Sequence, residues 1–104
     1  MKIYSYRGRK NVSGEKIHEF RTKRRLSQSE LAARIQLKGV MLERDSISRI
    51  ESGARFVADY ELHAFAEVLG VEVTELFDIE SGEYLLLFTP FSVTRSAMNR
   101  NYAT

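Results

Sequence analysis

The first run of helical spacing in this chain places Ile17 and Phe20 three positions apart among polar and charged residues. This pattern predicts a helix over residues 13 to 25, with Ser13 as its N-cap and a basic outer face. A second run follows in the stretch LSQSELAARI, where Leu31 precedes an isoleucine by four positions. It predicts a second helix, and its start carries the two residues of a capping box, Ser27 and Glu30.

Residues 36 to 43, QLKGVMLE, interrupt the helical spacing at Gly39. They still carry several apolar side chains, whose burial would be favourable. We therefore expect a structured connection that tucks these side chains under the domain, with Leu42 in the core. The apolar residues of this segment are Leu37, Val40, Met41 and Leu42.

The stretch DSISRIESG predicts a third helix, from about Arg44 to Gly53, because a glycine suits the left-handed conformation that ends many helices. We set the core direction midway between Ile47 and Ile50 and turn by about 100° per residue. Glu51 then lies roughly 70° from the core direction, too close for a freely solvated carboxylate, so it needs a partner. The side turned away from the core is formed by Asp45, Ser48, Arg49 and Ser52.

Two further helices are predicted beyond this point. Residues 59 to 69 repeat apolar positions at helical spacing and stop at Gly70, and a short fifth helix is expected over about 73 to 79. The two chain ends, KIYSYR and YLLLFTPFSV, favour extended structure. We expect short extended segments there, able to pair within one chain or across a dimer.

Charge is distributed unevenly along the 104 residues. Residues 1 to 25 hold nine lysines and arginines against two glutamates, whereas residues 56 to 83 hold eight acids and no lysine or arginine. One part of the molecule would attract a polyanion and another would repel it, which orients the domain on its partner. The alternative is a solvated basic arm that binds nothing.

Composition excludes several classes. The length suits one domain, and the absence of cysteine excludes disulfides and thiolate metal sites. No apolar run is long enough to cross a bilayer, and the N-terminus lacks a signal sequence, so we expect a cytoplasmic protein. His18 and His63 lack neighbours at ligand spacing, and no nucleophile elbow or glycine-rich phosphate loop occurs. We predict no metal, no cofactor and no enzyme activity.

Three stretches, LSQSELAARI, ISRIESG and LHAFAEVLGVEVTELF, together resemble the helix-turn-helix domain of the phage repressor, Cro and XRE-type regulators. The resemblance covers about residues 14 to 79. It implies an all-α, five-helix repressor-like fold in which the second and third helices form the DNA-binding unit. With the extended ends, the expected organisation is a basic arm over residues 1 to 12, the helix-turn-helix domain over 13 to 80, and a C-terminal extended tail over 81 to 104.

The resemblance also implies roles for individual residues. The family's base-reading positions, at the start of the third helix and one turn later, correspond to Arg44, Asp45, Ser46 and Arg49. The family's contacts to the DNA backbone correspond to Gln28, Ser52, Gly53 and Arg55. Arginine forks match the acceptors of guanine in the major groove, while Gln, Ser and backbone N–H groups suit phosphate oxygens.

A buried ion pair is common in this family between an arginine late in the first helix and a glutamate of the third. Arg21 and Glu51 occupy those places, so the resemblance implies a structural rather than a DNA-binding role for both. Asp45 is open to three readings, since an acid facing DNA repels phosphate. It could accept from a cytosine amino group, orient Arg49, or favour the positive end of the helix dipole.

The chain departs from the family in one place. Leu31 and Ile47 are sixteen positions apart, so the turn between the second and third helices is longer than is common. This leaves open the relative placement of Gln28 and Arg44, and whether Gln36 or Lys38 adds a contact to the DNA backbone.

The expected function is a sequence-specific double-stranded DNA-binding regulator, a repressor that binds its operator as a homodimer. The second possibility is a protein-interaction module, such as an antitoxin that grips a toxin through residues 84 to 93. A third is a phage-derived repressor whose effector part is reduced to the tail.

Overall fold

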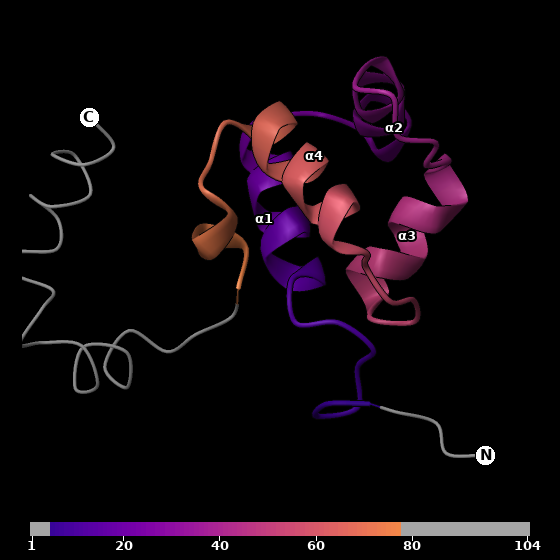
Figure 1. Cartoon of the computed structure of the whole chain (residues 1–104), viewed down its shortest axis with the longest axis vertical. Helices are drawn as coiled ribbons and strands as arrows, with labels where there is room; N and C mark the ends of the chain where they lie inside the picture. The colour runs from indigo at the N-terminus through magenta and orange to yellow at the C-terminus, as the bar shows by residue number, and fades with distance from the viewer. Residues whose placement is uncertain (1–4, 78–104) are drawn as a thin grey trace, which may run out of the picture.

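The computed structural model describes residues 5–77 (Figure 1). Four α-helices, α1 (Gly14–Lys23), α2 (Gln28–Leu37), α3 (Arg44–Ser52) and α4 (Asp59–Leu69), are followed by a 3₁₀ turn, η1 (Val73–Leu76). Helices α2 and α3 lie together on one side of the domain, and η1 lies on the other side against α1 and α4. The all-α prediction is confirmed for this part of the chain. The predicted tail over 81 to 104, with its possible partner strand 84 to 93, lies outside the described residues.

The described range shows four α-helices rather than five. Of the residues predicted as a fifth helix, 73 to 79, the structure describes those up to Phe77. They hold the 3₁₀ turn η1, and the Phe77 N–H donates to the Thr74 carbonyl at 3.3 Å. The β-branched side chains of Val73 and Thr74 disfavour an α-helix at this point. Leu76 is fully buried, so the turn still closes the core. Over residues 5–77 no helix is long and apolar enough to cross a membrane.

The start of α2 and the end of α3 are those predicted. Ser27 Oγ accepts from the Glu30 N–H at 3.0 Å and the Ser27 N–H donates to Glu30 Oε1 at 2.8 Å, which completes the capping box. Gly53 has a φ of 85°, and its N–H donates to the Ile50 carbonyl while the Ala54 N–H donates to the Arg49 carbonyl. This pair of hydrogen bonds is the Schellman motif, which a left-handed glycine permits.

Ser13 occupies the N-cap position of α1, as predicted, and its carbonyl accepts from the Ile17 N–H at 2.9 Å. Its side chain is buried and makes no capping bond. The Gly14 N–H donates instead to Asn11 Oδ1 at 2.8 Å, so the side-chain cap comes from two residues earlier. The helix also ends at Lys23 rather than at Arg25, which adopts a left-handed φ of 57°.

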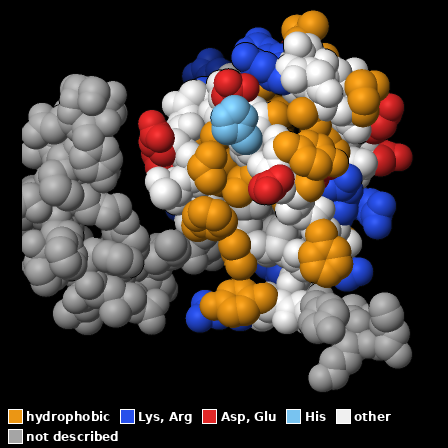
Figure 2. Space-filling view, in the orientation of Figure 1, with side chains coloured by type: hydrophobic (Ala, Val, Ile, Leu, Met, Phe, Trp, Pro, Cys, Tyr) orange, Lys and Arg blue, Asp and Glu red, His pale blue; other side chains and the backbone are white. Residues whose placement is uncertain are grey.

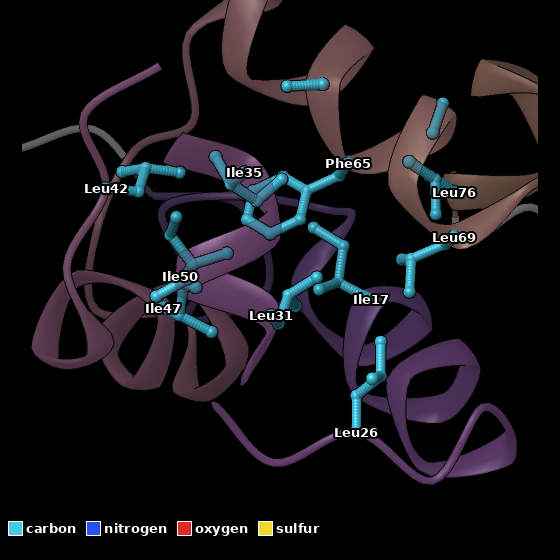
Figure 3. Close-up of a cluster of buried hydrophobic side chains, with 13 residues drawn as sticks. Ile17, Leu26, Leu31, Ile35, Leu42, Ile47, Ile50, Phe65, Leu69 and Leu76 are labelled. Carbon is cyan, nitrogen blue, oxygen red and sulfur yellow. The ribbon is translucent and has the colours of Figure 1, made fainter. Parts of the chain in front are cut away.

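The core forms where all four helices and the turn meet. Phe65 of α4 lies between Ile35 of α2 and Ile17 of α1, and Ile47 and Ile50 of α3 point in from the side (Figure 3). Leu42 is fully buried beside them, as predicted. A chain segment outside any helix thus contributes to the same core that fixes α3 against α2.

Two apolar side chains of the long turn are not tucked under the domain. Leu37 is 86% exposed and Met41 is 76% exposed, contrary to the prediction. Leu37 follows the buried Ile35 by two positions, which turns it about 200° around the helix, away from the core. Met41 precedes Leu42 in a non-helical segment, where neighbouring side chains point to opposite faces.

Candidate nucleic-acid interface

The outward face of α3 carries most of the predicted base-reading residues. The side chains of Arg44 and Asp45 are 60% and 89% exposed, Arg49 is exposed, and Ser46 is half-buried. Arg44 Nη1 lies 3.4 Å from Asp45 Oδ1, and within residues 5–77 the Arg49 guanidinium makes no ion pair. The arginine side chains of this face are therefore not engaged in the core.

Asp45 has neighbours that bear on its three readings. Its ion-pair partner is Arg44, and no hydrogen bond joins it to Arg49 among the described residues. It stands in the first turn of α3, where a carboxylate interacts favourably with the helix dipole. Orientation of Arg49 by Asp45 is therefore the reading with least support.

Beneath α3, one carboxylate collects donors from two other helices. The Glu51 side chain is 7% exposed, and Arg21 Nε and Nη2 donate to its two oxygens at 2.7 and 3.0 Å. Gln28 Nε2 donates to the same carboxylate at 3.0 Å, and His18 Nδ1 lies 3.0 Å from it. The structure thus brings together Arg21, Glu51 and Gln28, which the sequence had placed in two different roles.

The protonation of Glu51 follows from these contacts. Burial by itself raises the pKa of the Glu51 carboxyl, but the hydrogen bonds from Arg21 and Gln28 outweigh it and hold this pKa below its ordinary value. The same bond raises the pKa of Arg21. Both groups are therefore charged at neutral pH, and they tie the start of α2 and the body of α1 to the underside of α3.

The long turn between α2 and α3 is closed by hydrogen bonds. Gln36 Nε2 donates to the Leu42 carbonyl at 2.8 Å, and the Val40 N–H donates to the Ile35 carbonyl at 3.4 Å. Gly39, with a φ of 86°, makes the bend. Gln36 is thereby occupied in holding the turn, whereas Lys38 is exposed.

This geometry, a capped α2, a closed turn and an α3 with one buried and one exposed face, is that of a helix-turn-helix unit. A family model described as a helix-turn-helix domain, of the Cro and XRE-type class, matches residues 14–84. The chain belongs to this family. No curated protein and no solved structure matches it in the corresponding searches.

Membership of the helix-turn-helix family supports a DNA-binding regulator in general.

The loop after α3 was expected to hold phosphate, but one of its residues, Arg55, is bonded within the domain. Arg55 donates from both terminal nitrogens to the two oxygens of Glu61, at 2.9 and 3.1 Å, and also to the Phe56 carbonyl at 2.9 Å. Glu61 is 7% exposed. Burial raises the pKa of its carboxyl, and the bonds from Arg55 and the Ala58 N–H lower it further than burial raises it.

Ser52 and Gly53 complete the set of predicted residues. Ser52 is exposed, and its hydroxyl donates to the Arg49 carbonyl at 3.2 Å. Gly53 is buried, and a Cβ on it would lie 2.7 Å from Arg9 Cζ. The N–H groups of Gly53 and Ala54 close α3, so Ser52 is the residue of this stretch that faces outward.

The N-terminal arm contributes two residues that the sequence did not single out. Arg9 Nη2 donates to the Glu51 carbonyl at 2.9 Å. Asn11 Nδ2 donates to the carbonyls of Ile50 at 2.9 Å and of Arg55 at 2.8 Å. The last carbonyls of a helix lack partners within it, and a cation there interacts favourably with the dipole. Arg9 and Asn11 therefore cap the C-terminal end of α3.

These contacts had no local signal in the sequence. The hydrogen bonds join residues 39 to 44 positions apart, so neither helical spacing nor a short motif could reveal them. The arm can approach so closely because α1 begins with Gly14, on which a Cβ would overlap the Ile50 carbonyl oxygen. Before Arg9 the arm makes a tight turn, with positive φ at Arg7 and Gly8.

Proposed function

We propose that this helix-turn-helix domain is a sequence-specific double-stranded DNA-binding regulator that represses transcription and reads the major groove with α3. The observation that carries the proposal is the contrast around α3. Its inner face is fixed by Ile47, Ile50 and the Glu51 network, while Arg44 and Arg49 project from the outer face. A rigid helix that displays arginine forks is suited to base recognition.

Each outward residue has a chemical role in this proposal. Arg44 and Arg49 donate to guanine O6 and N7, and Ser46 adds a polar contact at the edge of the groove. Asp45 accepts from a cytosine amino group while its neighbour Arg44 offsets its repulsion from phosphate.

Contacts to the DNA backbone come from the two ends of the unit. At the start of α2, Gln28 is oriented by Glu51 and approaches a phosphate, and after α3 the Ser52 hydroxyl does the same. Arg55 shapes the loop through Glu61 rather than touching DNA. The partly exposed Lys10 of the arm lies near this loop, since Lys10 Nζ is 5.7 Å from the Phe56 ring centroid, and Arg7 of the same arm is exposed. The arm thus extends the phosphate-binding surface.

The acidic part of the chain fits this orientation. Its described exposed acids, Asp59, Glu67, Glu72 and Glu75, lie on α4 and around η1. Figure 1 shows η1 on the side of the domain opposite α2 and α3. DNA bound to α3 would therefore meet few of these carboxylates.

The regulator acts as a homodimer on a roughly palindromic operator with half-sites about one helical turn apart. The C-terminal tail, residues 81 to 104, supplies the dimer contact in this proposal. Light scattering of a chain that ends at Gly82 tests that part separately, because dimers that persist without the tail would remove this role for it.

The decisive experiment is in-vitro selection of bound duplexes, followed by gel shifts at several salt concentrations. Arg49→Ala should weaken binding to the selected operator by about 1–3 kcal/mol and relax preference at one base position. Arg49→Lys is the matched control, since it keeps the charge and loses the fork, so it should lose base preference while retaining affinity for random DNA.

Equal binding of the wild-type protein to selected and random duplexes would remove the sequence-specific function. The same result would leave the protein-interaction alternative, with residues 84 to 93 as the partner strand, to be tested by binding to a purified candidate toxin. Unchanged base preference in Arg49→Ala would remove that residue from the reading surface alone.

A further inference from the structure

Leu37 and Met41 are the most exposed of the large hydrophobic residues in the described part of the chain. Leu37 is the last residue of α2 and Met41 lies in the turn between α2 and α3, so the two flank the bend at Gly39. We define these two side chains as the apolar edge. Figure 2 shows hydrophobic side chains at the end of the domain where α2 passes into α3, close to charged side chains.

The apolar edge is held in place rather than loosely attached. The bond from Gln36 Nε2 to the Leu42 carbonyl joins the two ends of the segment. Leu37 and Met41 each lie one residue inside these ends, so this bond restrains the backbone that carries both side chains. Leu42 anchors that loop in the core at 0% exposure. Two outward apolar side chains on a fixed loop are prepared for a contact, because little conformational entropy remains to be lost on binding.

The position of the edge identifies its partner. Met41 stands three residues before Arg44, the first residue of α3, so the backbone holds it close to the start of the reading helix. Lys38, between the two side chains, is exposed and favours a polyanion. A second copy of the chain is a poorer partner, since two side chains fall far short of the roughly 800 Å² that each partner buries in a stable interface.

We propose that Leu37 and Met41 contact thymine methyl groups in the major groove, next to the bases read by Arg44. The proposal rests on the proposed function and names two further residues that determine sequence preference. The methyl group at C5 of thymine is the apolar feature of the major groove, and apolar side chains recognise it by contact. The longer turn thereby widens the sequence read by one domain.

Uracil tests this directly, because it pairs as thymine does and lacks the methyl group. In the operator obtained by selection, each thymine beside the Arg44 site is replaced by uracil in turn. Wild-type affinity should fall about fourfold at one or two positions, the effect expected for one buried methyl group. Met41→Ala and Leu37→Ala should each weaken binding to the thymine operator and show no further loss with uracil at the position contacted.

Phe56→Ala is the matched control, since Phe56 is 55% exposed and lies on the loop after α3. It should keep the full sensitivity to uracil. Met41→Leu should retain most of the affinity for thymine, which shows that loss in Met41→Ala comes from the apolar contact. Circular dichroism of each variant checks that the helices remain.

Several results would overturn the proposal. Equal binding of wild-type protein to thymine and uracil operators, or uracil sensitivity that persists in both alanine variants, would exclude a methyl contact by the apolar edge. A shift in oligomeric state on Met41→Ala would assign the edge to a second copy instead. If selection yields no preferred sequence, both the proposed function and the thymine contact are excluded. If it yields a strong preference without thymine beside the Arg44 site, the thymine contact alone is excluded.

Discussion

The two faces of α3 differ in almost every physical respect. The inner face buries Ile47 and Ile50, and Glu51 accepts from Arg21 and Gln28. The outer face exposes Arg44 and Arg49. Within the described residues Arg44 makes one ion pair, with Asp45 at 3.4 Å, and Arg49 makes none. Of the nine residues of α3, those on the inner face stabilise the fold, and those on the outer face are free to contact a partner.

This division separates stability from recognition. A residue on the inner face should change folding when it is replaced, and should affect DNA binding only through the loss of folded protein. A residue on the outer face should do the reverse. The C-terminal end of α3 sharpens the contrast, because Arg9 and Asn11 reach across from the arm and extend the buried network along the backbone.

The largest expected effect is at the buried ion pair. Glu51→Ala should lower the free energy of unfolding by about 3–5 kcal/mol, because Arg21 is left with a mostly buried charge and no carboxylate. Urea denaturation followed by circular dichroism measures this. In the double variant Arg21→Met with Glu51→Met, most of the loss should be recovered, and a loss in the double variant as large as the sum of the single ones would contradict the pairing.

A smaller loss is expected at the arm. Asn11→Ala removes the acceptor for the Gly14 N–H and the donor to the Ile50 carbonyl, both in the buried interior, and should cost about 2–3 kcal/mol. Ser5→Ala is the control, because Ser5 is exposed at the start of the described arm. If thermal melts showed Asn11→Ala and Ser5→Ala to be equally stable, the arm would not be part of the folded domain.

The pH dependence of stability should carry the signature of the inner face. The pKa values of Glu51 and Glu61 lie below their usual 4.5 in the folded protein, so the unfolded chain binds protons more readily. Their contribution to stability is present above about pH 4.5 and is lost as the pH falls through the folded pKa values. Urea titrations between pH 6 and pH 3 should therefore show stability falling, and Glu51→Gln should reduce the slope. Ser48→Ala, on the outer side of α3, should leave the slope as it is.

The smallest effect on folding is expected at Arg49. Arg49→Ala should change the free energy of unfolding by less than about 0.5 kcal/mol, since the side chain is exposed and unpaired within residues 5–77. The same protein sample should show the loss of operator binding. Destabilisation of several kcal/mol in Arg49→Ala would break the separation between the two faces.

The helices were accessible from the sequence because their signals are local. Ser27 and Glu30 lie one turn apart in the capping box, Gly53 directly follows the helix it ends, and Leu42 was correctly expected in the core. The segment predicted as a fifth α-helix holds a 3₁₀ turn instead. The sequence did not distinguish the two, because its apolar spacing fits both. Leu37 and Met41 were predicted to be buried because they are apolar, but both side chains are exposed, because they point away from the core.

The candidate site was accessible in part for the same reason. Arg44 and Arg49 follow from the rotation of one helix and from the family resemblance, which also paired Arg21 with Glu51. The sequence did not reveal that Arg55 binds Glu61 or that Gln36 donates to the Leu42 carbonyl, since several polar residues compete for each partner. Only the positions of the backbone atoms decide between them.

The amino-acid sequence by itself determined where α2 begins and α3 ends, which side of α3 is apolar, and that the chain carries a helix-turn-helix unit, because these depend on residues within a turn or two of one another. The tertiary structure alone decided that the arm caps α3, that Glu51 gathers donors from α1 and α2, and that Leu37 and Met41 face outward. Those outcomes depend on contacts across the chain, where geometry selects one partner among many of similar chemistry.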